Sequence, residues 1–267
     1  MTAFQQKVII ITGASEGIGR ALTIELAPQM PKLVLAARNE ARLKELLDEC
    51  EGVGAETLIV PTDVTSESDC KNLIDAAVNR FGQIDILVNN AGGTMWSLFE
   101  EVEDLSIYEK VMNLNYMSCV YCSYHALPHL KKTKGLVVGV SSIAGMTGVP
   151  TRTGYAASKH AQFGFFDSLR IELQGSGVDV TMIAPDFVVT EIHKRALKGD
   201  GEPMKDSPLK EGKVMTAREC ALLIAAGMER RERLVIGSSR GKIGRFLKLV
   251  WPKKMDNIAR KAISQGH

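Results

Sequence analysis

The sequence is poor in aromatic residues and has no long hydrophobic run. Aromatic side chains make up 6% of its 267 residues, and only two of them are tryptophans. A membrane-spanning helix needs about 18 or more consecutive apolar residues, and no segment of the chain comes near that length. The start of the chain, Met1 to Lys7, also lacks the apolar core of a secretory signal. These absences predict a cytoplasmic protein.

Cysteine is scarce as well, and its number and spacing argue against a disulfide framework. The five cysteines are an odd number without regular spacing, so we expect reduced thiols. Cys119 and Cys122 form a Cys-x-x-Cys, but they lie within an apolar helical pattern, and no second pair completes a zinc site. His125 and His129 lack a third ligand. No metal is therefore expected.

The chain does have enough apolar material for one large core. Hydrophobic residues make up 45% of the sequence, and its length suits a single α/β domain. Short apolar runs alternate with helical patterns, as in repeated β-α-β units. The predicted strands are 7–12, 32–37, 55–60, 84–88, 135–140, 178–183 and 233–236. Nearly continuous apolar strands of this kind are typical of a parallel sheet with helices on both faces.

The first predicted strand runs directly into a glycine-rich turn. Gly13, Gly17 and Gly19 follow the strand, and a helical pattern continues from Arg20 to Ala27. Glycine permits a positive φ and a close approach to the backbone, while the helix start offers N–H groups to a phosphate. The spacing Gly-x-x-x-Gly-x-Gly differs from the more familiar Gly-x-Gly-x-x-Gly of dinucleotide-binding folds. On spacing alone, a plain glycine-rich turn is an equal alternative.

Tyr155 and Lys159 are four residues apart, which places a phenol and an ammonium about one turn apart on one face of a helix. A neighbouring cation favours the phenolate form of a tyrosine. Such a tyrosine can give a proton to a carbonyl oxygen or take one from an alcohol. Two amphipathic residues at this spacing can also simply line a helix face, so the pair indicates an acid/base function only when other motifs accompany it.

Four motifs occur together in one order. They are Thr12-Gly13-Ala14-x-x-x-Gly17-x-Gly19, Asn89-Asn90-Ala91-Gly92, Ser142 thirteen residues before Tyr155, and Tyr155-x-x-x-Lys159. Together they resemble the short-chain dehydrogenase/reductases (SDRs) of the classical type, over roughly residues 5–240. The resemblance implies a Rossmann-like, doubly wound parallel sheet of about seven strands, with NAD or NADP at its carboxyl edge.

The resemblance also implies roles for individual residues. Tyr155 would exchange the proton, Ser142 would polarise the substrate oxygen, and Lys159 would hold the nicotinamide ribose. Asn115 would hold a water that links Lys159 to solvent. The implied cofactor contacts are Gly13, Ser15, Gly17, Ile18, Gly19, Arg38, Asp63, Val64, Asn89, Ala91, Gly92, Tyr155, Lys159, Pro185, Val188 and Thr190. Asp186 replaces the glycine of the family's Pro-Gly-x-x-x-Thr stretch, so its charge makes the pose of the nicotinamide an open question.

The end of the second predicted strand bears on the choice of cofactor. Family members that use NAD usually carry an acid there, whereas this chain has Ala37 followed by Arg38. A guanidinium can pair with the 2′-phosphate of NADP through two hydrogen bonds. Glu16 argues the other way, because many NADP-using relatives have a basic residue at its position, and Arg38 could be a solvated loop charge. We predict NADP(H), with NAD(H) as the alternative.

The expected activity is interconversion of a carbonyl and a secondary alcohol by hydride transfer, on an apolar small-molecule substrate. Met95, Trp96, Met146, Val149 and Phe187 suggest apolar pocket walls, and residues 187–213 would form the substrate lid. The alternatives are an NAD-dependent alcohol dehydrogenase and a non-catalytic dinucleotide-binding scaffold. A homo-oligomer, dimer or tetramer, is implied by the resemblance, with Val120, Phe163 and Phe166 as possible interface or core residues. Nucleic-acid binding is not expected.

The overall charge of +2 conceals a basic tail after the predicted SDR domain of residues 1–240. Residues 241–267 contain seven Lys or Arg and one Asp, a net charge of +6, against −4 for the preceding chain. Their apolar residues form one helical stripe, namely Ile243, Phe246, Leu247, Val250 and Trp251. A basic amphipathic segment of this kind can lie on an anionic membrane, here through residues 242–251. It can also close the substrate cleft or pack on another subunit, which is the interpretation we favour.

Overall fold

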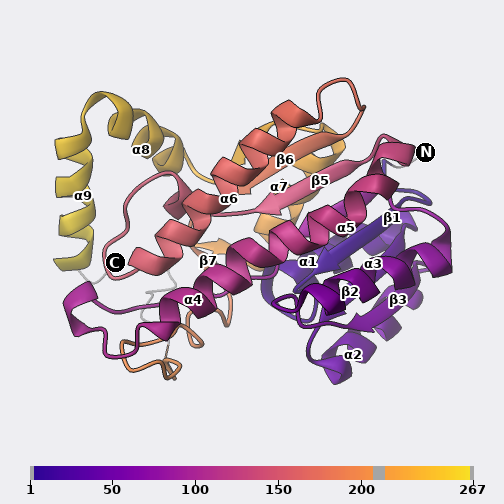
Figure 1. Cartoon of the computed structure of the whole chain (residues 1–267), viewed down its shortest axis with the longest axis horizontal. Coiled ribbons are helices and arrows are strands. Elements are labelled where there is room, and N and C mark those ends of the chain that lie inside the picture. The colour runs from indigo at the N-terminus through magenta and orange to yellow at the C-terminus, as the bar shows by residue number, and fades with distance from the viewer. Residues whose placement is uncertain (1–2, 207–213, 265–267) are drawn as a thin grey trace.

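The computed structural model describes residues 3–206 and 214–264, and its centre is a seven-stranded parallel sheet (Figure 1). The strand order is β3-β2-β1-β4-β5-β6-β9. The strands are β1 (Val8–Thr12), β2 (Lys32–Ala37), β3 (Glu56–Pro61), β4 (Ile86–Asn89), β5 (Leu136–Val140), β6 (Asp179–Ala184) and β9 (Leu234–Ile236). The predicted doubly wound α/β fold is confirmed, and every predicted strand begins within two residues of its observed start.

Helices connect the strands and cover both faces of the sheet. The α-helices are α1 (Gly17–Leu26), α2 (Glu40–Glu51), α3 (Glu67–Phe81), α4 (Ser106–Met112), α5 (Ser118–Thr133), α6 (Thr153–Glu172), α7 (Ala217–Glu229), α8 (Ser239–Val250) and α9 (Pro252–Ser264). Shorter turns are η1 (Ala27–Gln29), η2 (Phe99–Glu101), η3 (Asn113–Met117) and η4 (Ile143–Gly145). A two-stranded sheet that the sequence did not predict pairs β7 (Val188–Val189) with β8 (Met215–Thr216).

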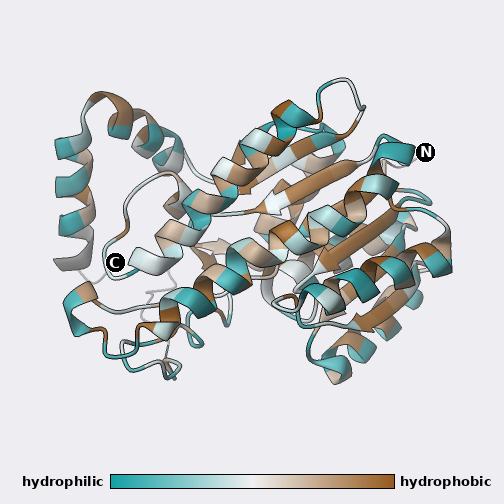
Figure 2. Ribbon diagram, in the orientation of Figure 1, coloured by the Kyte–Doolittle hydropathy of each residue, from teal (hydrophilic) through white to brown (hydrophobic). Residues whose placement is uncertain are grey.

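Alternating side chains of the sheet divide the interior into two cores. Ile9 and Ile11 of β1 pack on one face with residues of α1, α2 and α7. Val8 and Ile10 pack on the other face with residues of α3, α5 and α6. Successive side chains of a strand point to opposite faces, so a strand buried on both sides must be apolar throughout. Figure 2 shows the central strands as predominantly hydrophobic for this reason.

Polar side chains at the helix starts explain where the helices begin. Asn39, Ser66 and Ser238 each accept a hydrogen bond from a backbone N–H in the first turn of α2, α3 and α8. Thr216 and Glu219 form a reciprocal capping box at the start of α7. Such caps satisfy N–H groups that have no partner within the helix.

Several residues of the predicted interface or metal-binding patterns belong to the interior. Cys119 and Cys122 are buried core residues of α5, and Phe166 of α6 is fully buried in the same core. The choice that the sequence left open for Phe166 is therefore decided in favour of the core. Within residues 3–206 and 214–264, no helix has both the length and the apolar character needed to cross a membrane.

The order of the strands places the site. The chain leaves β1 toward β2 and β3, and later returns to β4 on the other side of β1. The loops after β1 and β4 therefore diverge in opposite directions and leave a crevice at the carboxyl edge between them. The segments that follow β2, β5 and β6 begin at the same edge, because all strands of the sheet are parallel.

Candidate active site

A cavity of about 990 Å³ lies at the carboxyl edge of the sheet. Most residues that the resemblance assigns to the cofactor or to catalysis line it. These are Gly13, Ser15, Gly17, Ile18, Arg38, Asp63, Val64, Ala91, Gly92, Ser142, Tyr155, Pro185, Val188 and Thr190. The other four, Gly19, Asn89, Asn115 and Lys159, are not in the lining.

The glycine-rich turn after β1 has no room for a side chain at Gly13 or Gly19. Gly13 and Gly17 have φ of +66° and +54°, which other residues rarely adopt. A Cβ on Gly13 would lie 2.9 Å from the Cα of Ala91, and one on Gly19 would lie 2.2 Å from the carbonyl oxygen of Gly13. The three glycines therefore allow the first turn of α1 to approach both its own loop and the loop after β4.

Hydrogen bonds fasten this turn to the loop after β4. The Thr12 hydroxyl accepts from the N–H groups of Asn90 and Ala91, each at 3.0 Å. The Asn90 amide donates to the carbonyl of Thr12 at 2.8 Å. The side chain of Asn89 lies elsewhere, buried, and donates to the Ser123 hydroxyl at 3.3 Å. Of the two asparagines, Asn90 is the one that lines the cavity, and a cofactor contact through the Asn89 side chain does not fit this geometry.

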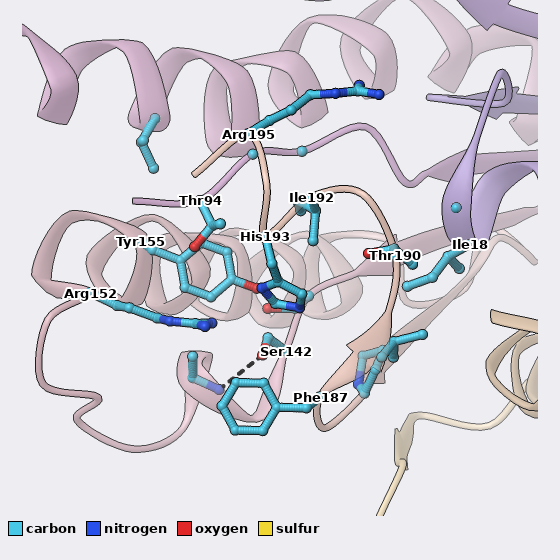
Figure 3. Close-up of a pocket in the computed structure, with 18 of the residues that line it drawn as sticks. Ile18, Thr94, Ser142, Arg152, Tyr155, Phe187, Thr190, Ile192, His193 and Arg195 are labelled. Carbon is cyan, nitrogen blue, oxygen red and sulfur yellow. Dashed lines mark hydrogen bonds between the residues drawn. The ribbon is translucent and has the colours of Figure 1, made fainter. Parts of the chain in front are cut away.

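Tyr155 and Ser142 lie on the same part of the cavity wall (Figure 3). Tyr155 is in the first turn of α6, and its side chain is largely buried. Ser142 follows β5, and its hydroxyl oxygen accepts a hydrogen bond from the backbone N–H of Ala144 at 3.2 Å. The oxygen is thereby held in place while its proton stays available to another acceptor.

Lys159 lies one turn behind Tyr155 and is buried. Its Nζ is 5.8 Å from the centroid of the Tyr155 ring. The ammonium donates to the carbonyl oxygen of Val140 at 3.1 Å and to the side-chain oxygen of Gln162 at 3.2 Å. The predicted Tyr-x-x-x-Lys pair thus faces one side of α6, with the lysine fixed by the end of β5.

Asn115 lies in the π-helical turn η3 between α4 and α5. Its side-chain amide exchanges two hydrogen bonds with the backbone of Gly93 and donates a third to the Ser158 hydroxyl. Its backbone carbonyl accepts from the Gln162 amide at 2.6 Å. The same carbonyl also accepts from the Cys119 thiol at 3.1 Å, so side chains of α5 and α6 meet at this oxygen.

Gln162 is a residue that the sequence reasoning missed. It is fully buried, and its amide joins the carbonyl of Asn115 to the ammonium of Lys159. Asn115, Gln162 and Lys159 therefore form one continuous chain of hydrogen bonds behind Tyr155. The signal was a glutamine three residues after Lys159, on the face of α6 that turns toward the sheet.

The other end of the cavity carries an arrangement of charges. Arg38 is exposed and makes no hydrogen bond or ion pair with a described residue. Hydrogen bonds from the backbone and hydroxyl of Thr65, together with the charge of Arg38, hold the pKa of Asp63 below its usual value. Glu16 forms ion pairs with both Arg42 and Arg195. Neither of these arginines was predicted, and Arg195 lies 179 residues from Glu16 in the chain.

Asp186, which replaces a glycine of the family pattern, also has a cationic partner. Its carboxylate receives hydrogen bonds from Arg240 at 2.6 and 3.1 Å and from the Ser238 hydroxyl at 2.7 Å. Its backbone φ is not positive, so this segment does not require glycine. The charge that raised a question about the nicotinamide pose is therefore paired with the start of α8.

The helices of the tail contribute to the cavity on one side only. Gly241 and Gly244 of α8 and Met255 and Ile258 of α9 line it. The other side of α8 is exposed, and its large apolar residues are Ile243, Phe246, Leu249, Val250 and Trp251. The two helices form an arm beyond α6, yellow in Figure 1. The side of α8 and α9 that lines the cavity is consistent with a tail that closes the cleft, whereas the exposed side of α8 has no such role.

The predicted apolar pocket is only partly correct. Trp96, Val149 and Phe187 line the cavity, whereas Met95 and Met146 do not. Met95 is fully buried in a small core against Ile107 and Val111, because the backbone of the 94–97 segment turns it inward. Of the predicted lid, residues 187–206 are described and several of them line the cavity, while 207–213 lie outside the described residues.

Comparison with known proteins agrees with this geometry. A family model for the short chain dehydrogenases matches residues 7–200. The chain belongs to this family. It is 33% identical to a dehydrogenase/reductase SDR family protein 7-like of Dictyostelium discoideum, covering 99% of this chain and 84% of that protein. It is 35% identical to the 11-beta-hydroxysteroid dehydrogenase A of Sesamum indicum, covering 95% of this chain and 74% of that protein.

Solved structures show the same SDR fold. An SDR from Burkholderia phymatum in complex with NAD superposes with a TM-score of 0.82, at 27% identity, over 93% of this chain and 94% of that one. An alcohol dehydrogenase from the archaeon Thermococcus sibiricus, complexed with 5-hydroxy-NADP, gives 0.74 at 25% identity, over 86% and 95%. One structure holds NAD and the other an NADP derivative, so the preference of this SDR has to be argued from its own residues.

The packing of the glycine turn makes a first prediction. In Gly19→Ala the new methyl would lie 2.2 Å from the carbonyl oxygen of Gly13, so the turn must shift. We expect a loss of about 1–3 kcal/mol of folding free energy and a clear loss of dinucleotide affinity. Thermal unfolding and a cofactor titration measure the two effects. The control is Gly164→Ala in α6, which meets nothing within 4 Å and should unfold no earlier than the wild type. Equal behaviour of the two variants would contradict the prediction.

Proposed function

We propose that this SDR is an NADP(H)-dependent oxidoreductase that interconverts a carbonyl and a secondary alcohol by hydride transfer. The observation that carries the proposal is the placement of three side chains. The hydroxyls of Tyr155 and Ser142 face one cavity, and the ammonium of Lys159 lies buried behind the tyrosine. The same cavity continues to the glycine-rich turn, so a reactive end and a dinucleotide end are joined.

The residues at the glycine-rich turn fit a dinucleotide. The glycine-rich turn lines the cavity through Gly13, Ser15 and Gly17, directly before the N–H groups at the start of α1, where a diphosphate would bind. Ser15 and Ile18 would flank the diphosphate, and Asp63 and Val64 would lie against the adenine end. When bound, the nicotinamide would supply or accept the hydride.

The protein residues manage the substrate oxygen and its proton. In the reducing direction Tyr155 would give its proton to the carbonyl oxygen, and Ser142 would donate a hydrogen bond to the same oxygen. Lys159 would stabilise the resulting phenolate, because a positive charge close to the ring lowers the free energy of the anion. In the oxidising direction the same residues would act with reversed roles. Gln162 would keep Lys159 oriented and connected to the carbonyl of Asn115.

The preference for NADP(H) is supported by the charges at the adenine end. Arg38 extends from the end of β2 with no described partner, and no carboxylate occupies that position. Glu16, which argued against NADP(H) on sequence grounds, is paired with Arg42 and Arg195, so its charge is compensated. A 2′-phosphate would therefore meet a net positive surface.

Removal of Arg38 tests this preference. In Arg38→Ala we expect the Kd for NADPH to rise about 10–100-fold, because a hydrogen bond to a charged group contributes about 1.5–3 kcal/mol. The Kd for NADH should change little. Fluorescence titration of both cofactors measures the difference, and Arg20→Ala, which removes a surface arginine paired with Glu49, is the control. A wild-type preference for NADH would instead indicate an NAD-dependent alcohol dehydrogenase.

Removal of the Tyr155 hydroxyl tests the chemistry. Tyr155→Phe should lower kcat by about 100-fold or more, as expected for loss of a general acid, and should leave NADPH affinity intact. The control is Tyr108→Phe, whose hydroxyl bonds to Thr153 at 2.8 Å and does not line the cavity. Retained turnover in Tyr155→Phe would refute the role. NADPH binding without turnover by the wild type over a broad carbonyl panel would favour a non-catalytic scaffold.

The sequence favoured closure of the cleft or packing on another subunit, but only the inner side of α8 faces the cavity, and we further propose that its exposed apolar side makes a peripheral membrane contact. Phe246 and Trp251 are 63% and 62% exposed, and Lys242, Arg245 and Lys248 lie on the same helix. We expect salt-sensitive binding to vesicles that contain anionic lipid, and its loss in Phe246→Asp. Sedimentation with neutral vesicles is the control. If the protein binds no vesicles, the membrane proposal is wrong. A dimer or tetramer detected by light scattering on the same sample would then indicate that a second copy of the chain covers this side of α8. The cytoplasmic location stays a prediction.

A further inference from the structure

The guanidinium of Arg152 is buried without a compensating charge. Arg152 is 4% exposed and lies directly before α6, three residues from Tyr155. Its Nη2 is buried with no hydrogen-bond partner, and the group forms no ion pair with a described residue. Arginine is almost never buried in this way unless it is paired. Burial lowers the pKa of Arg152 to about 10, which still leaves it charged at neutral pH.

Aromatic rings hold this guanidinium but do not satisfy it. Its carbon lies 4.0 Å from the ring centroid of Trp96, 5.1 Å from that of Phe187 and 5.9 Å from that of Tyr155. Contacts with ring faces are worth about 0.5–2 kcal/mol, whereas removing an unpaired charge from water costs several. The rings lie against the guanidinium and offer no lone pair to its N–H groups, so the buried Nη2 still lacks an acceptor. A planar fork of N–H groups matches the two oxygens of a carboxylate.

The acidic side chains around the cavity are already engaged. Asp186 is paired with Arg240, Glu16 with Arg42 and Arg195, Glu191 with Lys194, and Asp63 accepts from Thr65. None of these described carboxylates is bound to Arg152. The compensating anion is therefore most simply brought by a ligand.

Arg152 points to the place where the chemistry would occur. In Figure 3 its guanidinium lies among Tyr155, Ser142 and Phe187, and all four residues line the cavity. His193 lies on the same wall, and its buried Nδ1 also lacks a partner. Burial and the charge of Arg152 lower the pKa of His193 to about 4, so the ring is neutral and adds no second charge. Arg240, which lies over the same Phe187 ring, is already paired with Asp186, so the charge of Arg152 is the one left to compensate on this wall, and one such charge suits a monoanion.

We propose that Arg152 binds a carboxylate of the substrate next to the reacting carbonyl, so that the substrates are oxo acids and hydroxy acids with an otherwise apolar body. The proposal rests on the proposed function and replaces the wholly apolar substrate expected from the sequence. Trp96, Val149 and Phe187 would contact the apolar body, and His193 would accept or donate one hydrogen bond at the polar end.

The test compares acids with their esters. Medium-chain oxo acids, with the carbonyl at successive positions, and their methyl esters are assayed with NADPH for the wild type, Arg152→Met and Arg152→Lys. For the best acid, Arg152→Met should lose on the order of 100-fold in kcat/KM, as when one partner of a buried charged pair is removed. The ester should change little, and so should the Kd for NADPH. Arg152→Lys keeps the charge but not the fork of N–H groups, so its kcat/KM for the acid should lie between those of the wild type and Arg152→Met.

A matched control is Arg80→Met. Arg80 also lies over an aromatic ring, that of Phe81 at 5.4 Å, but is outside the cavity. It should not alter the ratio of acid to ester activity. Thermal unfolding gives a second readout, because replacing an uncompensated buried charge by an apolar side chain of similar size should raise the melting temperature of Arg152→Met. A preference for the ester in the wild type, or an equal loss on both substrates, would overturn the proposal.

Binding without turnover separates this proposal from the proposed function. In Trp251→Phe the only tryptophan is Trp96, which stacks on Arg152. Octanoate should change its fluorescence in a saturable manner, methyl octanoate should not, and Arg152→Met should abolish the response. A fluorescence response to octanoate without turnover of any oxo acid would support the carboxylate site at Arg152 and contradict the proposed dehydrogenase activity. Turnover of esters without a fluorescence response to octanoate would support the dehydrogenase activity and contradict the carboxylate site.

Discussion

The buried ammonium of Lys159 is the interaction on which the arrangement of the candidate active site depends. A charge removed from water must be surrounded by acceptors, and here they come from two parts of the chain, the carbonyl of Val140 at the end of β5 and the side chain of Gln162 in α6. Satisfying the lysine therefore fixes α6 against the edge of the sheet. Tyr155, one turn earlier, is positioned as a consequence. Through Gln162 the same group is connected to η3, because the Gln162 amide also donates to the Asn115 carbonyl there.

The sequence predicted those parts of the fold that follow from local patterns. A strand buried on both faces has to be apolar throughout, so Ile9, Ile10 and Ile11 identify β1 without knowledge of its neighbours. The turn after it could be predicted because only glycine permits the required φ and approach. The strands β7 and β8 could not be predicted, because a strand of two residues is too short to show an alternation of apolar and polar side chains.

The site was predictable to the extent that its residues belong to contiguous motifs. Ion pairs between distant segments could not be predicted, because the charge of one side chain does not reveal which side chain it will pair with. Glu16 appeared unfavourable for NADP(H) until Arg195 was found beside it, and Asp186 appeared as an extra charge until Arg240 was found beside it. Met95 was expected in the cavity from its hydrophobicity alone, but hydrophobicity does not distinguish a pocket wall from a small core.

Helix α8 has its two sides in different environments. Gly241 and Gly244 present bare backbone to the cavity, and Phe246 and Trp251 stand in solvent on the other side. A helix with its side chains is only about 10 Å across. Whatever settles on the outer side is thus separated from the cavity by a single layer of polypeptide, so a change in what covers this helix acts directly on the shape of the cavity wall.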